Sequence, residues 1–247
     1  MTKLVKYTIR GLKNGECDVR DYVTYGNTNS TNTSRYYLYV WLIQGGESPV
    51  IVDTGVREIE PLNRVIAKSV PEGIKQKPEE RTRQLLKSVN VDPGDVSHVI
   101  VTHLHQDHYE CYDLFENAQL VVNRKGFLEN LLGIKRNVMK ALATKWPDSL
   151  HLAKDEEEIL PGIRVFWVGG HSICSQAVAI ETSKGTAIIT GDVVFKYRNI
   201  EENIPIGLAY NTEQCMAAME RIRREADIIL PGHDPEILER HPNGIIG

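Results

Sequence analysis

Metal-binding side chains are concentrated in the segment 102–108, which reads THLHQDH. Three histidines and one aspartate lie within six residues here, although the whole chain of 247 residues contains eight histidines. Imidazole and carboxylate groups are ligands for zinc and related divalent cations. The segment leaves the apolar run 96–102, which predicts a short strand. A loop that leaves a buried strand can fold all four side chains around one point, so a metal site is favoured over a polar surface loop.

Three more residues of ligand type each follow a predicted strand. His171 comes after the run 163–169, Asp192 after 186–190, and His233 after 226–230. Each lies next to glycine, which lets the backbone turn sharply and pass close to an ion. A single histidine in such a place is more often structural or exposed. Together with the first cluster, however, these residues indicate one larger metal site.

These motifs together resemble those of the metallo-β-lactamase superfamily. The string THLHQDH is similar to the HxHxDH signature, and the later VGGHS, TGD and PGH elements follow in the order and spacing of that family. The early VDTG at 52–55 is similar to its buried loop containing an aspartate. The resemblance extends from about residue 36 to about residue 235. It implies an α/β (α+β) fold, a four-layer αββα sandwich.

The resemblance also implies a ligand set for two divalent ions. His103, His105 and His171 would bind the first ion; Asp107, His108 and His233 would bind the second; Asp192 would bridge both. Zinc is the first expectation, with manganese, iron or cobalt as alternatives, because ligand types alone do not select the metal. Asp53 would orient ligands without binding metal, or else it is only a turn residue.

Such a site would support hydrolysis of a lactone or a similar small cyclic ester. Two ions that share a hydroxide lower the pKa of the bound water to roughly 7, so a nucleophile is present at neutral pH. The hydroxide would attack the carbonyl carbon. By family analogy, Asp107 would pass a proton to the leaving oxygen, and Asp192 would hold the two ions together.

Within the superfamily, the chain is most similar to N-acyl homoserine lactonases, with two departures. Those enzymes typically place a tyrosine three residues after the bridging aspartate, and this chain has Phe195 there. A small residue and glycine often follow their DH pair, whereas here the segment 109–111 reads YEC. Tyr197, Tyr109 or Tyr112 could supply the missing hydroxyl as an oxyanion donor, or could be packing aromatics. The pocket is expected to be bulkier and more polar than in those lactonases.

Two other functions are alternatives at this stage. A thioester hydrolase of the glyoxalase II type would use the same ligands, but only 14 residues follow His233 and leave no room for its separate C-terminal domain. A non-catalytic binding protein stabilised by metal is disfavoured, because no ligand is missing. The net charge of −4 predicts no binding to nucleic acid or to anionic membranes.

The rest of the chain predicts one domain over residues 1–247 in which strands and helices alternate. Strands are expected at 36–44, 49–55, 96–102, 118–122, 163–169, 176–182, 186–192 and 226–232. Helices are expected at 58–68, 78–89, 125–145 and 212–225, and the polar segment 26–34 is expected to be a loop. The small-molecule pocket is expected near 26–34, 109–113 and 195–210, and the apolar helical region leaves a homodimer possible.

The chain is expected to be cytoplasmic. Its first 16 residues contain no apolar core of signal-peptide length, and no run approaches 18 apolar residues. The four cysteines are scattered and form no CxxC pair, so free thiols are expected.

Overall fold

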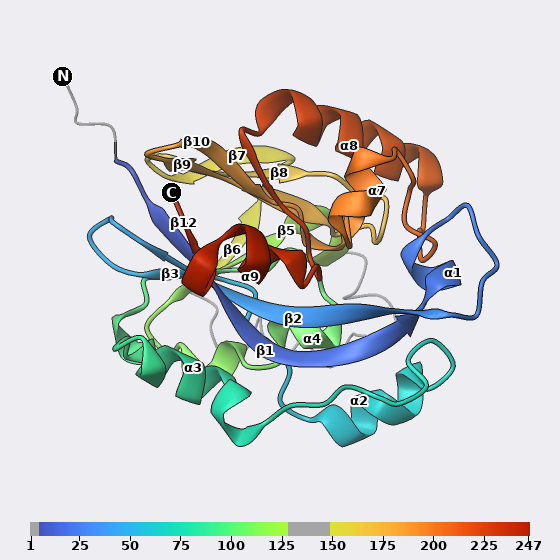
Figure 1. Cartoon of the computed structure of the whole chain (residues 1–247). Coiled ribbons are helices and arrows are strands. Elements are labelled where there is room, and N and C mark those ends of the chain that lie inside the picture. The colour runs from blue at the N-terminus through green and yellow to red at the C-terminus, as the bar shows by residue number, and fades with distance from the viewer. Residues whose placement is uncertain (1–4, 128–148) are drawn as a thin grey trace.

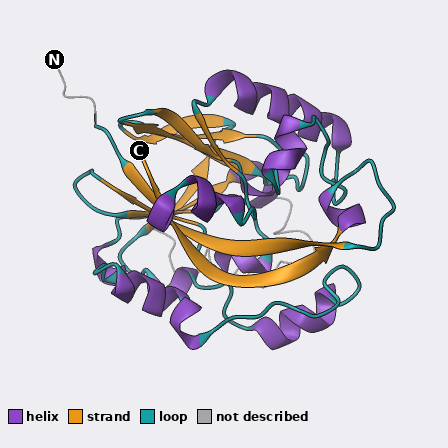
Figure 2. Cartoon of the chain, in the orientation of Figure 1, coloured by secondary structure: helices purple, strands orange, loops and turns teal. Residues whose placement is uncertain are grey.

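Two β-sheets pack face to face with helices on their outer sides (Figure 1). The computed structural model describes residues 5–127 and 149–247. Within these residues, one sheet has seven strands in the order β12-β1-β2-β3-β4-β5-β6, and the other has five in the order β11-β10-β9-β8-β7. The predicted four-layer αββα sandwich is therefore confirmed (Figure 2).

The larger sheet combines a long hairpin with a parallel half. Its strands are β1 (Thr8–Arg20), β2 (Thr33–Gln44), β3 (Val50–Val52), β4 (His98–Ile100), β5 (Gln119–Asn123), β6 (Leu150–Ala153) and β12 (Ile245–Ile246). β1 and β2 are antiparallel along their whole length, whereas β3 to β6 run parallel. Parallel neighbours end at the same edge of a sheet, so the loop after β3, which begins with Asp53, meets the histidine-rich loop after β4.

The smaller sheet brings the other ligand-type residues to one edge. Its strands are β7 (Glu156–Leu160), β8 (Ile163–Trp167), β9 (Gln176–Thr182), β10 (Gly185–Ile189) and β11 (Ile228–Leu230). β9 is antiparallel to β8 and to β10, and β11 is parallel to β10. The strands β8, β10 and β11 therefore point the same way, and the chain continues from their ends to His171, Asp192 and His233.

An apolar core fills the space between the sheets. It contains Trp41, Val52, Ile100, Val165 and Ile189, each at most 1% exposed. Burial of each of the four aliphatic side chains in this list contributes roughly 1.5–3 kcal/mol. Because this core lies just below the strand ends, it holds the two ligand-bearing edges at a constant separation.

Helices cover both outer faces of the sandwich. The described helices are α1 (Asp21–Thr24), α2 (Ile59–Ile66), α3 (Thr82–Ser88), α4 (Gln106–Tyr109), α7 (Tyr197–Glu201), α8 (Thr212–Glu225) and α9 (Glu236–Arg240). Short 3-10 helices occupy Pro78–Glu80, Pro93–Asp95, Tyr112–Leu114, Gly191–Val193 and Pro242–Gly244. α8 lies over the smaller sheet, and α2 and α3 lie beyond the larger one (Figure 1). No helix in the described part of the chain is long and apolar enough to cross a bilayer.

The observed elements agree with most of those predicted. The strand 176–182 and the helix 212–225 have the predicted bounds, and the segment 78–89 is divided into a 3-10 turn and α3. β1, β6, β7 and β12 were not predicted. The helical prediction for 125–145 falls mostly on 128–148, outside the described residues. All four cysteines are free and buried, as expected.

Candidate metal centre

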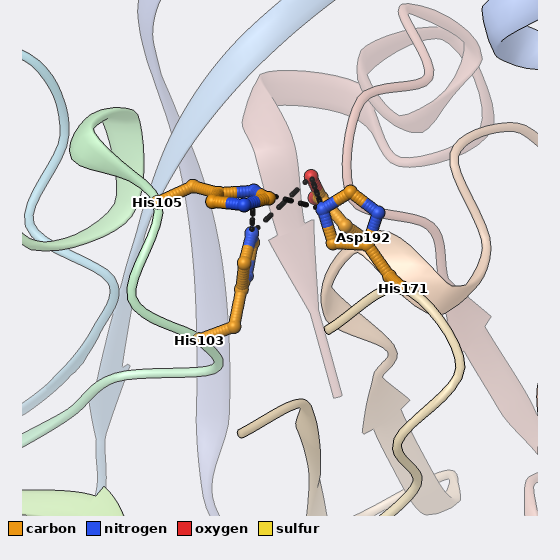
Figure 3. A group of neighbouring side chains, drawn as sticks. All are labelled: His103, His105, His171 and Asp192. Atoms are coloured by element: carbon orange, nitrogen blue, oxygen red, sulfur yellow. Dashed lines mark hydrogen bonds and ion pairs between the residues drawn. The ribbon is translucent and has the colours of Figure 1, made fainter. Parts of the chain in front are cut away.

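The first group of ligand-type side chains brings together three separate loops. His103 and His105 come from the loop after β4, His171 follows β8, and Asp192 follows β10 (Figure 3). Each offers one ligand atom, and these atoms all lie within 4.8 Å of one another. The four side chains point toward a common centre in Figure 3.

The spacing within this group is that of a coordination shell. Nδ1 of His105 lies 3.0 Å from Nε2 of His103 and 2.9 Å from Nε2 of His171. Oδ2 of Asp192 lies 3.5 and 3.3 Å from the same two Nε2 atoms. Four ligands at zinc bond lengths in a tetrahedron are separated by about 3.4 Å. Nδ1 of His105 carries at most one hydrogen, which it can donate to only one of these two Nε2 atoms. A shared cation therefore explains both contacts better than hydrogen bonds do.

A second group lies beside the first and consists of Asp107, His108 and His233. Oδ2 of Asp107 lies 3.5 Å from Nε2 of His108. Oδ1 of Asp192 lies 3.3 Å from Nε2 of His108 and 3.0 Å from Nε2 of His233. One oxygen of Asp192 thus faces each group, which is the arrangement of a ligand that bridges two cations.

Two buried atoms of this centre fit a metal because they lack any other partner. Nε2 of His108 and Oδ1 of Asp192 are buried, and neither has a hydrogen-bond partner among the described residues. A buried polar atom without a partner costs about 1–3 kcal/mol. A divalent cation held by these side chains would satisfy both atoms at once.

The electrostatics of the centre also suit cations. Burial lowers the pKa of His103 well below its usual value, and it lowers the pKa of His171 as well. Both therefore carry a neutral imidazole, the form that binds metal. Burial opposes ionisation of Asp192, but the nearby His108, His233 and His103 hold its pKa well below the usual range. Asp192 is therefore a buried carboxylate that needs positive charge around it.

Hydrogen bonds at the far nitrogen orient the histidines. Nδ1 of His171 donates to the carbonyl oxygen of Leu208 at 2.9 Å, and Nδ1 of His233 donates to the carbonyl oxygen of Tyr37 at 3.0 Å. Nδ1 of His103 lies 3.2 Å from the hydroxyl of Thr102. Because a carbonyl only accepts, the proton of His171 and of His233 is on Nδ1 and the lone pair of Nε2 faces the centre.

Asp53 performs the same task for His108. Its Oδ2 lies 2.7 Å from Nδ1 of His108, and its two oxygens accept hydrogen bonds from the amide and the hydroxyl of Thr102, each at 2.8 Å. Asp53 has a positive φ of 56° and belongs to neither ligand group. This geometry favours the orienting role over that of a simple turn residue.

A cavity of about 370 Å³ adjoins the centre. His105, Asp107, His171, Asp192 and His233 line it on one side. The other walls come from β1, β2, α2 and the segment after α2, and are mostly apolar: Cys17, Val19, Val23, Tyr36, Leu38, Leu62, Val65, Ile66, Ser69, Val70 and Ile74. The expectation that loops 26–34 and 109–113 shape the pocket is wrong, since no residue of either lines it. The segment 195–210 contributes Phe195 and Leu208.

The proposed oxyanion role of Tyr197 is contradicted by its position. Its side chain is 5% exposed and packs in the core between the sheets, with the guanidinium of Arg240 3.6 Å from the ring centre. Its hydroxyl is buried and has no hydrogen-bond partner within the described part of the chain, and the residue does not line the cavity. Tyr109 and Tyr112 also lie outside the cavity lining and pack against a different apolar cluster.

Two aromatic rings frame the centre instead. Phe195, expected in the pocket, lines the cavity with its ring 5.6 Å from that of His171 and 5.8 Å from that of His233. Tyr36 stacks on His233 with centroids 5.1 Å apart, and its hydroxyl donates to Thr24 at 3.0 Å. Tyr36 was predicted only as part of a strand, and Thr102 was not singled out either. Nothing local in the sequence distinguishes them from ordinary strand residues.

The sequence matches the profile of the metallo-β-lactamase superfamily over residues 35–233. The chain belongs to this superfamily. The matched range contains every residue of the two ligand groups. Among curated relatives, the N-acyl homoserine lactonase AiiA of Bacillus thuringiensis is 28% identical over 214 residues, which cover 81% of this chain and 82% of that protein.

Solved structures of superfamily members show the same fold. A Bacillus thuringiensis AiiA variant with N-decanoyl-L-homoserine bound at its active site aligns with a TM-score of 0.80 and 24% identity over 96% of both chains. AidC, a dizinc quorum-quenching lactonase in complex with its product, aligns with a TM-score of 0.69 and 12% identity over 98% of this chain and 90% of AidC. The predicted family, fold and metallo-hydrolase class are confirmed.

Proposed function

We propose that this superfamily member is a dinuclear metallo-hydrolase that opens a lactone or a similar small cyclic ester. The metal ligands in this proposal are His103, His105 and His171 for one ion, Asp107, His108 and His233 for the other, and Asp192 for both. The observation that carries the proposal is the position of Asp192, whose two oxygens face the two groups at the side of an apolar cavity.

Zinc is the proposed metal. The donor set of imidazole nitrogens and carboxylate oxygens suits zinc, and the spacing of the first group is close to that of a tetrahedral shell. AidC, which shares the fold, is a dizinc protein. Manganese, iron and cobalt accept the same ligands, so metal analysis of the isolated protein is part of the test.

The cavity supports an ester with an aliphatic portion as the substrate. Its walls on β1, β2 and α2 are mostly apolar, and each methylene group buried there contributes about 0.8 kcal/mol. Several curated relatives, which match over 81% to 85% of the chain, are N-acyl homoserine lactonases. We therefore include N-acyl homoserine lactones among the lactones to be tested.

Individual side chains of this protein have different roles in the proposed hydrolysis. When bound, a pair of divalent cations supplies an acidified water and a Lewis acid for the ester carbonyl. Asp107 lines the cavity with its side chain 23% exposed, so its carboxyl group is placed to pass a proton to the departing alkoxide. Asp192 fixes the positions of both histidine groups. Phe195 and Tyr36 exclude bulk water from one side of the centre.

A combined metal and substrate assay tests this function. The purified protein is analysed for metal per chain, then assayed against γ- and δ-lactones of varied tail, against thioesters and against phosphodiesters. We expect two equivalents of metal and hydrolysis confined to the lactones. Turnover of thioesters alone would replace the proposal with a glyoxalase II type of function, and two bound ions without any turnover would indicate a metal-stabilised binding protein.

A further inference from the structure

A buried ion pair lies beside the proposed ligand His233 and belongs to neither ligand group. Nζ of Lys196 lies 3.3 Å from Oδ1 of Asp234, and the two side chains are 15% and 1% exposed. Asp234 follows His233 in the sequence, and Lys196 follows Phe195. Neither member of the pair lines the cavity. The pair can therefore affect the metal centre only through the loops that carry it.

The carboxylate of Asp234 extends a pairing between two of these loops. Two backbone hydrogen bonds, of 2.9 and 3.0 Å, join the segments 194–195 and 232–233. At the next position a side chain replaces the backbone, since the amide of Tyr197 donates to Oδ2 of Asp234 at 2.8 Å. The first segment directly follows the 3-10 helix that contains Asp192. Asp234 thus ties the loop of the bridging candidate to the loop of the second group.

The ammonium group of Lys196 connects this pairing to β2. Its Nζ donates to the carbonyl oxygen of Arg35 at 3.0 Å. Two residues further along β2, Tyr37 accepts from Nδ1 of His233 and donates its amide to the carbonyl oxygen of His233, each at 3.0 Å. The ion pair therefore joins the three segments that fix the backbone and the ring of His233. A shift of β2 against these loops would turn Nε2 of His233 away from the proposed metal.

The contacts of the pair are confined to the side of the second group. Besides Lys196 and the amide of Tyr197, Asp234 accepts from the amide of Glu236 at 3.0 Å. Within residues 5–127 and 149–247, neither side chain of the pair has a hydrogen bond or ion pair with the first group. Removal of one partner from a buried ion pair leaves an uncompensated charge, whereas removal of both is often tolerated.

We propose that Lys196 and Asp234 are positioning residues that act as a pair and set the metal affinity of the second group through His233. This inference rests on the proposed two-metal centre and is independent of the identity of the substrate. The pair neither binds metal nor contacts the reacting atoms.

The test measures metal affinity instead of turnover. Competition with a chelator gives the two dissociation constants for zinc in the wild type, Asp234→Asn, Lys196→Met and the double variant. His233→Ala identifies which of the two constants belongs to the second group. The control is Arg198→Met, because Arg198 is 55% exposed and pairs with Glu202 on the same helix. The thermal midpoint of each metal-free variant is recorded alongside.

We expect each single substitution to weaken zinc binding at the second group about tenfold. The first group and the control should keep wild-type affinity. Asparagine at position 234 keeps the shape of aspartate, but its NH2 group must face either the amide of Tyr197 or the ammonium of Lys196, and both are donors. The double variant should lose about tenfold and not about a hundredfold, because both substitutions remove the same interaction.

The other outcomes overturn the inference or leave it standing without the lactonase proposal. Wild-type affinity at the second group in both single variants, or equal loss at both groups, would show that the pair only supports the fold. A hundredfold loss in the double variant would show that the two residues act independently. If Asp234→Asn does not fold, Lys196→Met alone decides. The expected pattern in a protein that hydrolyses no lactone would support the inference and overturn only the proposed reaction.

Discussion

Replacement of Asp53 by asparagine probes how the second proposed metal is held. The carboxylate of Asp53 accepts three hydrogen bonds, two from Thr102 and one from His108. Asparagine has the same shape and tolerates the positive φ of 56° at this position. The substitution therefore changes the hydrogen-bonding pattern with little change in backbone strain.

The asparagine amide cannot satisfy all three partners. If its oxygen faces the amide of Thr102, its NH2 group faces Nδ1 of His108; if it is flipped, the NH2 group faces the amide of Thr102. Two donors then face each other in a buried place, which costs about 1–3 kcal/mol. His108 can escape only by moving its proton to Nε2, the atom that is aimed at Asp192 and Asp107. At 1.4 kcal/mol per factor of ten, the penalty corresponds to about 5- to 150-fold in affinity.

We expect Asp53→Asn to weaken one metal site about 10- to 100-fold. Competition with a chelator measures the two dissociation constants, and lactone turnover is followed as metal is restored. The site at His108 should weaken while the site at His103 and His105 changes little. Asp155→Asn is the control, because its half-exposed carboxylate only pairs with Lys125 and Arg124. Wild-type affinity at both sites in Asp53→Asn would refute the argument that Asp53 orients His108.

Three further predictions follow from the same contacts. Asp192→Ala should remove both ions and abolish hydrolysis, since each of its oxygens faces one group; wild-type metal content by elemental analysis would exclude a bridging role. Phe195→Tyr should keep both metals but change the ranking of lactones in kcat/KM, because the ring lines the cavity; metal loss would mean that the ring supports the ligands instead. Burial raises the pKa of Cys17 from 9.0 to about 12, so its thiol should resist alkylation at pH 8 until the protein unfolds, as peptide mass analysis can show. The same shift should make the free energy of unfolding decrease as pH rises from about 9 toward 12, because only the unfolded thiol ionises in that range.

The strands that were not predicted show where the local sequence pattern does not indicate secondary structure. β1 carries lysine, arginine, glutamate and two glycines within Thr8–Arg20, yet it pairs with β2 along its whole length and with β12 on its other side. Some of its polar side chains have partners that are distant along the chain: Lys13, for example, pairs with Glu80. β7 reads EEEIL and β12 has two residues. Such segments become strands because a neighbour supplies hydrogen bonds, and this neighbour cannot be read from a short window.

The cavity was harder to predict than the metal centre. Ligand-type residues after strands are visible in the sequence because few other positions combine histidine, aspartate and glycine. The apolar residues that line the cavity, such as Leu38, Leu62 and Val70, look like any core residue. Only the position of α2 relative to β1 and β2 determines that they face an open space. For the same reason Tyr197 was a candidate for the missing hydroxyl, although its ring packs in the core.

The sequence by itself determined the family, the strands that lead into the ligand-bearing loops, and the seven residues proposed to bind metal. These follow from residue type and local spacing, because a ligand must have a suitable donor atom and each candidate follows the end of an apolar run. Only the tertiary structure decided that Asp192 lies between the two groups and that Asp53 faces His108. Those contacts join residues distant along the chain, and the packing of the two sheets sets their geometry.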